Sequence, residues 1–362
     1  MSTVSPAVAE AKARLDSIIR KARVDLYKPI QIAEVLHRSR TKGDVDVKDV
    51  DSYRNESLRW RNVVSQKLLG KQSSSSAQFQ HNLWAENAMP PRLLAVLDAE
   101  NRRVAGQVER YIYMKFKQRQ SVVAKIIDVI NAATAEEFQV GELFALFRRE
   151  AGIRRSIDKA YEIVAHSLFE TLVTGLEASV KVSVPESSSG MLSEFDALAS
   201  MIPGVTPERT QRTQPAHIYR AGVTNAADRG LDMWANFGPA IQVKHLPLDE
   251  ALAKEIINQV ESDQVVIVCQ SAEASVLRTV RAQLGWGRRV RGVVTEQDLI
   301  DWHERCLRGS FSGKLAAPLL KRLREGFKAE FPQVAGILEF FTERGYLDED
   351  PLGLWQAASI AT

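Results

Sequence analysis

The chain has 362 residues, with 48 Lys and Arg against 45 Asp and Glu, and 45% of its side chains are apolar. This length and composition are typical of a globular protein with two or three domains. The formal net charge of +3 is nearly balanced, so a nucleic-acid surface has to be sought in the local distribution of charge.

Cysteine content and apolar runs exclude two further classes of protein. Cys269 and Cys306 are the only cysteines in the sequence, too few for a disulfide framework or a multi-cysteine zinc site. The densest apolar runs are short, such as VVIVC at 265–269, and charged residues interrupt the N-terminus from Glu10 onward. We therefore expect a cytoplasmic protein with no membrane partner.

The first part of the chain has the spacing of amphipathic helices. Apolar residues recur every three or four positions up to about residue 175, as in RLDSIIRKA, PIQIAEVLHRS and QSVVAKIIDVINAA. Glycine and proline interrupt this pattern where turns are needed. We predict a helical domain over 1–153 that serves DNA binding or dimerisation.

Near residue 180 the apolar period changes to two, which indicates strands. The predicted strands are 179–184, 231–236, 239–244, 264–269 and 290–295. The predicted helices among the last of these strands are 248–261, 272–284 and 296–307. A stretch rich in Ser, Thr, Pro and Gln at 186–215 is interpreted as an excursion from the sheet with one short helix. The alternation predicts an α/β (or α+β) core at 154–310 and a helical segment at 311–362.

The pattern DRGLDMWANFGPAIQVK, from Asp228 to Lys244, is the most informative for chemistry. Side chains alternate along a strand, so Gln242 and Lys244 share one face while Val243 faces the core. A tight Phe-Gly-Pro turn folds this strand back on the one that begins near Asp232. The hairpin thus brings together a carboxylate for a divalent cation, an oxygen ligand and an ammonium group, as phosphodiester hydrolysis requires.

This segment resembles the active-site motif of the PD-(D/E)XK nuclease superfamily, in particular its Mrr-like members. SLFETLVTGLEASVKVSV is similar to the first helix and first strand of that core, which implies Glu170 as a catalytic glutamate. The resemblance implies a mixed sheet flanked by helices, with Asp232, Gln242, Lys244 and Glu170 as catalytic residues. It also implies Mg²⁺ held by Asp232, Glu170 and the carbonyl of Val243, with no organic cofactor.

Gln242 departs from the commoner pattern of the superfamily, which has an acid at this position. An amide is a weaker ligand for a hard cation than a carboxylate. Mrr-like nucleases also have Gln-x-Lys, so the departure weakens the motif without excluding catalysis. It places more demand on Asp232 and on a second acid, for which Glu170 is the first choice and Asp228 the second.

Nearly the whole chain is similar to the HaeII-like type II restriction endonucleases. The matching segments are VDLYKPIQIAEVLHRSR, SYRNESLRWRN, SSSSAQFQ and AADRGLDMWANFGPAIQVKH. This resemblance implies a type II site-specific deoxyribonuclease that cleaves double-stranded DNA with Mg²⁺ at a short GC-rich palindrome, RGCGCY. Because a palindrome has two-fold symmetry, a homodimer with one active site per strand is the simplest assembly.

Basic residues are concentrated late in the chain. Residues 276–328 hold 12 Lys and Arg against 5 Asp and Glu. Such a region can supply the salt-sensitive part of DNA affinity, and arginine can also read guanine in the major groove. The predicted DNA-binding residues are Arg278, Arg281, Arg288, Arg289 and Arg291.

Simpler interpretations remain open at this point. An exposed hairpin with a surface lysine would produce the Asp-Gln-Lys pattern, a helix-surface glutamate would explain Glu170, and a solvated helix face would explain the arginines. Two rival functions also remain. One is an Mrr-like modification-dependent or repair nuclease, and the other is a catalytically inactive DNA-binding protein, a possibility that Gln242 keeps open.

Overall fold

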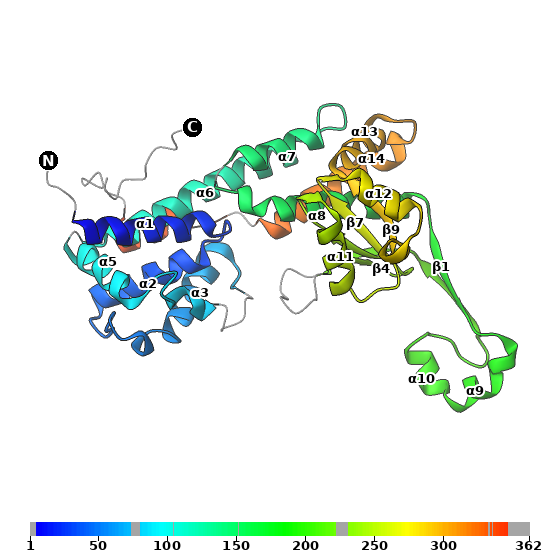
Figure 1. Cartoon of the computed structure of the whole chain (residues 1–362), viewed down its shortest axis with the longest axis horizontal. Helices are drawn as coiled ribbons and strands as arrows, with labels where there is room; N and C mark the ends of the chain where they lie inside the picture. The colour runs from blue at the N-terminus through cyan, green and yellow to red at the C-terminus, as the bar shows by residue number, and fades with distance from the viewer. Residues whose placement is uncertain are drawn as a thin grey trace.

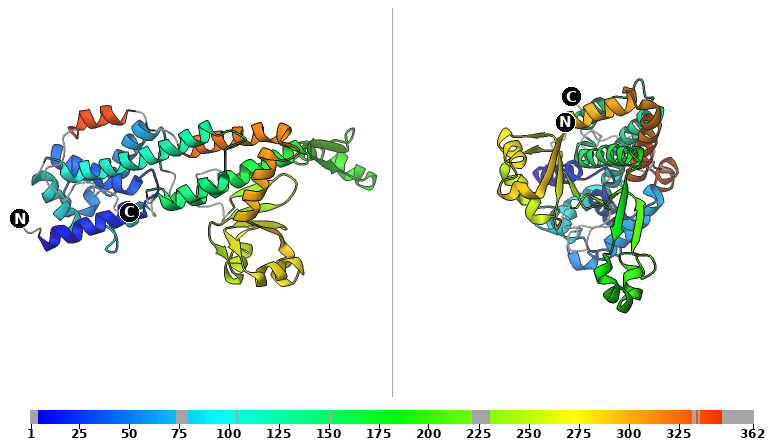
Figure 2. Two further views of the ribbon diagram at one scale, coloured as in Figure 1. Left: turned by 90° about the horizontal axis from the view of Figure 1, so that it is seen from above. Right: turned by 90° about the vertical axis from the view of Figure 1, so that its right-hand side faces the viewer.

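The computed structural model describes residues 5–73, 80–103, 105–150, 152–221, 231–331, 334 and 336–346. The molecule is elongated, with a helical body at the end that holds the N-terminus and a sheet-containing body at the other (Figure 1). A narrow arm projects from the second body into solvent. Figure 2 shows the long helix α6 running between the two bodies.

The helical body has its own core of apolar side chains, among them Leu36, Leu94, Tyr113 and Phe340. Pro6 begins the first helix, where its missing N–H costs no hydrogen bond, and Gly70 ends the third in a left-handed conformation. The helices are α1 (Pro6–Lys21), α2 (Tyr27–Thr41), α3 (Glu56–Leu69), α5 (Pro91–Arg103), α6 (Gln107–Ala132), α15 (Ile337–Arg344) and the short 3₁₀ helices η1 (Val50–Ser52) and η2 (Asn82–Trp84).

Helix α6 belongs to both bodies. Tyr113 and Phe116 lie in the core of the helical body, whereas Val123 and Ile130 lie in the core beneath the sheet. The other helices of this second core are α7 (Val140–Arg149), η3 (Arg154–Ser156), α8 (Ile157–Gly175), α13 (Glu296–Arg308) and α14 (Ser312–Glu330). The C-terminal helices separate, because α14 packs on α8 while α15 returns to the helical body. Side chains from both sides of the predicted domain boundaries therefore share a core. The division into domains stays a prediction.

A mixed sheet of five strands forms the centre of the second body; a mixed sheet was predicted, whereas its strand at 218–220 was not. Its order is β3-β4-β5-β7-β9, antiparallel through the first three strands and parallel through the last three. The strands are β3 (Ile218–Arg220), β4 (Met233–Ala235), β5 (Ala240–Val243), β7 (Val265–Cys269) and β9 (Val290–Thr295). Helix α8 covers one face and α11 (Glu250–Gln259), α12 (Ala274–Arg281) and η5 (Gly285–Arg289) cover the other. The short strands β6 (Pro247–Leu248) and β8 (Ser271–Ala272) pair beside it.

The predicted strand at 179–184 exists but does not belong to this sheet, so its assignment as the first strand of the nuclease core was wrong. It forms β1 (Ser179–Ser183), which pairs with β2 (Gln211–Pro215) in a separate ribbon. Neither strand has a fully buried face that would hold it on the sheet. The ribbon is the stem of the arm, and its tip contains η4 (Glu186–Ser188), α9 (Ser189–Glu194) and α10 (Asp196–Met201) (Figure 1).

Candidate active site

The β4–β5 hairpin sets the register of the predicted motif. Gly238 has a φ of +124°, a conformation that favours glycine, and the amide of Ala235 donates to the carbonyl of Pro239 across the turn. Met233 then pairs with Ile241 in the antiparallel ladder. Continuing this register by one position places Asp232 opposite Gln242.

Asp232 lies at the start of β4 with a carboxylate fixed by the neighbouring strand. Its Oδ2 accepts a hydrogen bond of 2.7 Å from the amide of Val243, and its own carbonyl accepts one from Ala221. Burial raises the pKa of Asp232, while the amide of Val243 and the nearby cation of Lys244 act to lower it. The structure therefore places Asp232, Val243 and Lys244 together at the carboxyl end of β5, as predicted from the sequence.

Gln242 is only 3% exposed, and its Oε1 has no hydrogen-bond partner within the part of the chain that the structure describes. An unsatisfied buried oxygen of this kind costs about 1–3 kcal/mol. Natural proteins keep few such atoms, and each one calls for an explanation. A cation bound beside Asp232 would give this oxygen a partner.

Lys244 directly follows β5 and continues its ladder, because its amide donates to the carbonyl of Val268 at 2.8 Å. The strand alternation therefore extends to this residue, so Lys244 and Gln242 emerge on the same face. Val243 belongs to the apolar core beneath α8, on the opposite face. The predicted split between polar and core positions is present in the fold.

Glu170 lies elsewhere. Its carboxylate accepts hydrogen bonds from the amide of Ile218 at 2.7 Å and from Nδ1 of His217 at 2.9 Å, at the start of β3. Ile218 pairs with Ala235, three positions along β4 from Asp232, or roughly 10 Å at the usual strand rise. The structure thus uses Glu170 to hold β3 rather than bringing it to the aspartate, and its predicted catalytic role acquires no contact.

A different acid of α8, Glu162, lies near enough to Asp232 for the charge of the aspartate to raise its pKa. Its side chain is buried and pairs with Lys159 at 2.7 Å and with Arg220 at 3.6 Å. Burial raises the pKa of Glu162, Lys159 lowers it, and the charge of Asp232 raises it further. Sequence reasoning missed Glu162 because the family resemblance was drawn on SLFETLVTGLEASVKVSV, which begins after Glu162, although α8 begins at Ile157. The available signal was an acid within the apolar run AYEIVAHSL.

Arg220 links this acid to the rest of the molecule. It pairs with Glu162 and, at 3.5 Å, with Glu330 at the end of α14. Asp25 of the helical body lies close by, because Glu330 contributes to raising its pKa after burial, and Lys71 pairs with it at 3.3 Å. Charges from three parts of the chain therefore meet around Arg220 and Glu330. Asp228, the other candidate acid, lies outside the described residues.

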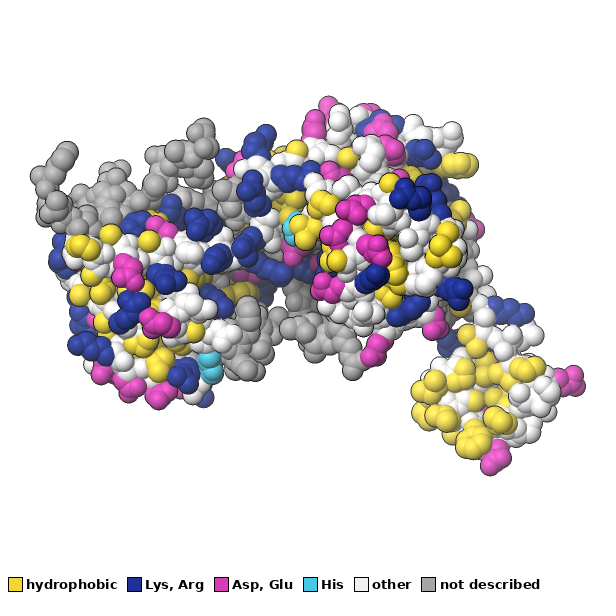
Figure 3. Space-filling view, in the orientation of Figure 1, with side chains coloured by type: hydrophobic (Ala, Val, Ile, Leu, Met, Phe, Trp, Pro, Cys, Tyr) yellow, Lys and Arg dark blue, Asp and Glu magenta, His cyan; other side chains and the backbone are white. Residues whose placement is uncertain are grey.

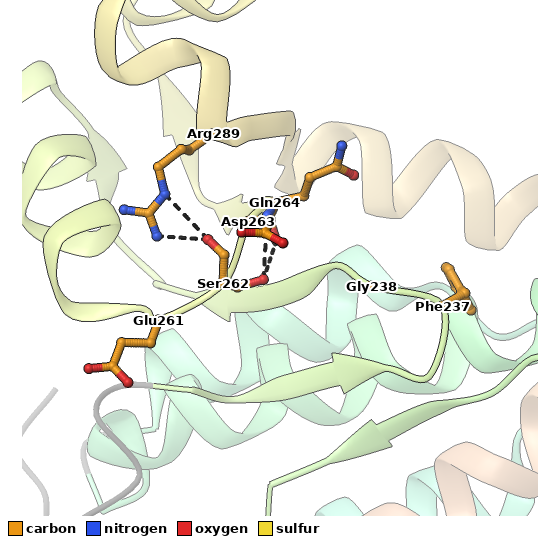
Figure 4. A pocket seen from close by; sticks show the side chains of 7 residues that line it. All are labelled: Phe237, Gly238, Glu261, Ser262, Asp263, Gln264 and Arg289. Atoms are coloured by element: carbon orange, nitrogen blue, oxygen red, sulfur yellow. Dashed lines mark hydrogen bonds between the residues drawn. The ribbon is translucent and has the colours of Figure 1, made fainter. Parts of the chain in front are cut away.

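The predicted DNA-binding arginines lie on α12 (Arg278, Arg281), on η5 (Arg288, Arg289) and at the start of β9 (Arg291), towards the amino end of the parallel strands. Lys244 lies at the opposite end of those strands. Arg278, Arg281 and Arg288 are exposed, whereas Arg289 donates to the carbonyls of Ile257, Val260 and Ser262. Figure 4 shows the contact with Ser262 in the open pocket at this end of the sheet. Arg289 thus serves the fold, and a DNA contact for this set stays a prediction.

The described residues limit what other sites the molecule contains. Among the described residues, no three His, Cys, Asp or Glu side chains are arranged to hold a metal ion. Asp232 and Glu162 therefore need amide or carbonyl oxygens to complete a cation site. In the same part of the chain, no helix has the length and apolarity required to cross a bilayer.

Comparison with known proteins identifies the family. The chain is 45% identical to the type II restriction enzyme NgoBI of Neisseria gonorrhoeae over 340 residues, which are 93% of this chain and 96% of that protein. It is 43% identical to the type II restriction enzyme HaeII of Haemophilus aegyptius over 338 residues, with the same coverage of each. No solved structure matches. The profile of the HaeII restriction endonuclease family matches residues 11–346, and the chain therefore belongs to that family of type II restriction endonucleases.

Proposed function

We propose that this restriction endonuclease hydrolyses phosphodiester bonds in double-stranded DNA with Mg²⁺, at a centre formed by Asp232, Gln242, Val243 and Lys244. Glu162 takes the place of Glu170 as the second acid. The observation that carries the proposal is the Oε1 of Gln242, which is buried and has no hydrogen-bond partner among the described residues, beside the fixed carboxylate of Asp232. The target is a short GC-rich palindrome, with RGCGCY as the sequence that the family resemblance implies.

The donor set fits a hard divalent cation. Carboxylate, amide and backbone carbonyl oxygens are the ligand types that Mg²⁺ and Ca²⁺ accept. Asp232 and Glu162 would supply the negative charge, and Gln242 Oε1 and the Val243 carbonyl would supply neutral oxygens. When bound there, Mg²⁺ would polarise the scissile phosphate and lower the pKa of the attacking water.

The chain's own residues hold this centre in place. The Val243 amide fixes one carboxylate oxygen of Asp232, which leaves the other for a ligand. Lys159 and Arg220 hold Glu162 from two sides. The ammonium group of Lys244, on the same face as Gln242, is positioned to orient water or to stabilise negative charge that develops on the phosphate.

A plasmid digestion tests the proposal. The full chain is incubated with plasmid in Mg²⁺ or in EDTA, and the cut ends are sequenced. We expect cleavage at one palindrome in Mg²⁺ alone, and loss of cleavage in Lys244→Ala. The matched control is Lys254→Ala, because Lys254 is an exposed lysine paired with Glu250 on α11. Cleavage by Lys244→Ala at the wild-type rate would contradict the proposed centre.

Methylation separates the proposed function from the modification-dependent rival. Methylated and unmethylated plasmids are digested side by side under the same conditions. A restriction enzyme for an unmodified site cuts the unmethylated plasmid and spares DNA methylated within the palindrome. Cutting confined to methylated DNA would favour the rival, and binding without any cleavage in Mg²⁺ would favour an inactive DNA-binding protein.

A further inference from the structure

Glu162, the second acid of the proposed centre, already has a positive charge against its carboxylate. Nζ of Lys159 lies 2.7 Å from Oε1 of Glu162 and 2.8 Å from Oε2, so one ammonium group contacts both oxygens. The side chain of Glu162 is 7% exposed and that of Lys159 is 17% exposed. The oxygens that the proposed function assigns to a metal ion are therefore engaged by a lysine.

The charge of Lys159 reaches both acids of the centre. Burial raises the pKa of Glu162, and Lys159 is the largest of the influences that lower it. Burial also raises the pKa of Asp232, and Lys159 acts there in the same direction, after the amide of Val243 and the ammonium group of Lys244. An ordinary ion pair on a helix surface joins two neighbouring residues, whereas Lys159 lies close enough to influence two acids from separate elements.

A metal ion and the ammonium group cannot share this carboxylate at low cost. Mg²⁺ binds oxygen at about 2.0–2.1 Å, so an ion on Oε1 of Glu162 would lie within about 5 Å of Nζ of Lys159 while the ion pair remains. Two positive charges at this separation repel each other strongly where burial limits screening by water. Close binding of a metal ion to Glu162 therefore requires Lys159 to withdraw.

Lys159 is the partner of Glu162 that is able to withdraw. Arg220, the other cation beside Glu162, is farther away at 3.6 Å and also pairs with Glu330 at 3.5 Å. Lysine carries its charge on a flexible four-carbon stem, and its ammonium group is strongly hydrated in water. The side chain of Lys159 also retains access to solvent. The ion pair of Lys159 and Glu162 is therefore the contact that a metal ion would break.

A released Lys159 would join a basic surface. It lies near the start of α8, where the residue before it, Asp158, pairs at 3.2 Å with Arg23 between α1 and α2 of the helical body. Figure 3 shows lysine and arginine side chains gathered along the junction of the two bodies, on the face drawn there. Such a surface attracts DNA phosphates. The lysine would therefore leave the carboxylate for a surface suited to the substrate.

We propose that Lys159 is an exchangeable counter-ion of the centre. It neutralises Glu162 until a metal ion binds, and it leaves the carboxylate when the ion takes its place. The lysine then has two opposite effects, because it lowers the cost of burying Glu162 near Asp232 and weakens the binding of the ion that must displace it. This role rests on the proposed function, because Glu162 has to be a ligand of the metal ion. Lys159 is thus a positioning residue that sets metal affinity.

Binding of Mn²⁺ to the full chain without DNA tests the exchange, and the electron paramagnetic resonance signal of free Mn²⁺ measures it. Mn²⁺ accepts the same oxygen ligands as Mg²⁺. Lys159→Met removes the ammonium group and should tighten Mn²⁺ binding by at least about 10-fold, as expected when a like charge a few ångströms away is removed. Lys159→Arg keeps the charge and should bind Mn²⁺ as weakly as the wild type.

Two further variants show whether the gain is specific. Lys254→Met is the matched control, because Lys254 also pairs with a glutamate at 2.7 Å, on the exposed surface of α11, and it should leave Mn²⁺ affinity unchanged. Lys159→Met combined with Glu162→Gln should bind Mn²⁺ no more tightly than Glu162→Gln alone. Thermal unfolding reports whether each variant is folded. Lys159→Gln keeps a hydrogen-bond donor for Glu162 and takes the place of Lys159→Met if that variant does not fold.

The outcomes separate the exchange from the proposed function. Mn²⁺ affinity that stays the same or falls when the charge of Lys159 is removed overturns the exchange, because the lysine would then only hold Glu162 in place. Tight binding by Lys159→Arg, or a gain that persists in the Glu162→Gln background, also overturns it. If the wild type cuts plasmid in Mg²⁺ and Lys159→Met gains no affinity, the proposed function stands alone. If Lys159→Met gains affinity and the wild type does not cut DNA, the exchange stands while the proposed function fails.

Discussion

Two buried acid clusters, one in each body of the molecule, have pKa values shifted in opposite directions. Glu109 in the helical body is fully buried, and burial raises its pKa. Hydrogen bonds from His37, Arg40, Tyr346 and Asn101 outweigh that effect and bring the pKa down to about 2. At the candidate active site, burial keeps the pKa values of Glu162 and Asp232 raised despite Lys159, the Val243 amide and Lys244. Hydrogen-bond donors outweigh burial at Glu109, which makes that cluster structural. Burial outweighs the partners of Glu162 and Asp232, and a bound cation would offset its effect.

The largest expected effect concerns the acids of the candidate active site, Asp232 and Glu162. Asp232→Asn or Glu162→Gln should lower the rate of DNA cleavage in Mg²⁺ by about 100- to 1,000-fold or more, because each removes charge that a cation would balance. The free energy of unfolding should stay the same or rise, since a costly buried charge is removed. Glu170→Gln is the matched variant on the same helix, and it should lower stability rather than the cleavage rate of the folded protein. The reverse result would restore Glu170 as the catalytic acid.

Substitution in the Glu109 cluster should have the opposite effect, because it should change stability and not DNA cleavage. Glu109→Gln should lower the free energy of unfolding by about 3 kcal/mol, because a pKa of about 2 in place of 4.5 measures the interactions that favour the charged form. Urea denaturation at neutral pH measures this change. DNA cleavage by the folded variant should match the wild type. A variant as stable as the wild type would show that this hydrogen-bonded cluster contributes little.

The two clusters should also differ in the sign of their pH dependence. The stability contributed by Glu109 is present above its unfolded pKa near 4.5 and is lost as the pH falls towards 2. The raised pKa values of Glu162 and Asp232 act in the other direction, so the stability that they contribute is present at low pH and is lost as the pH rises through those values. Urea midpoints of unfolding should be measured from pH 3 to 8. Compared with the wild type, the midpoint of Glu109→Gln should fall less as the pH is lowered, and that of Asp232→Asn should fall less as the pH is raised towards neutral.

The smallest effect concerns the arginines at the far end of the sheet. Arg278→Ala combined with Arg281→Ala should weaken DNA binding several-fold and lower the salt slope by about 0.9 for each lost phosphate contact. Arg289→Ala should instead lower stability, because three backbone carbonyls lose their donor. Fluorescence anisotropy with a labelled duplex at several salt concentrations measures the first change. An unchanged salt slope would remove this surface from the DNA interface.

Local sequence was sufficient for the hairpin of the candidate site. The Phe-Gly-Pro turn and the period-two pattern place Asp232, Gln242 and Lys244 within a few residues of one another, so strand alternation and one tight turn fix their common edge. The α/β alternation after residue 240 likewise predicted β5, β7 and β9 within one or two residues. In these cases the relevant contacts are local or follow from a short repeating pattern.

Long-range packing decided the rest. The sequence contains two glutamates on α8, but only the docking of this helix on the sheet brings Glu162 to Asp232 and Glu170 to the start of β3. The pattern VKVSV predicts a strand without naming its partner, and tertiary structure pairs it with β2 in the arm. Residue type and periodicity therefore determined which groups are available for chemistry and which segments form helices and strands. Their assembly into a site depended on packing between segments far apart in the chain. The period of the apolar side chains shows which face of a segment is buried, but it does not show which other segment covers that face.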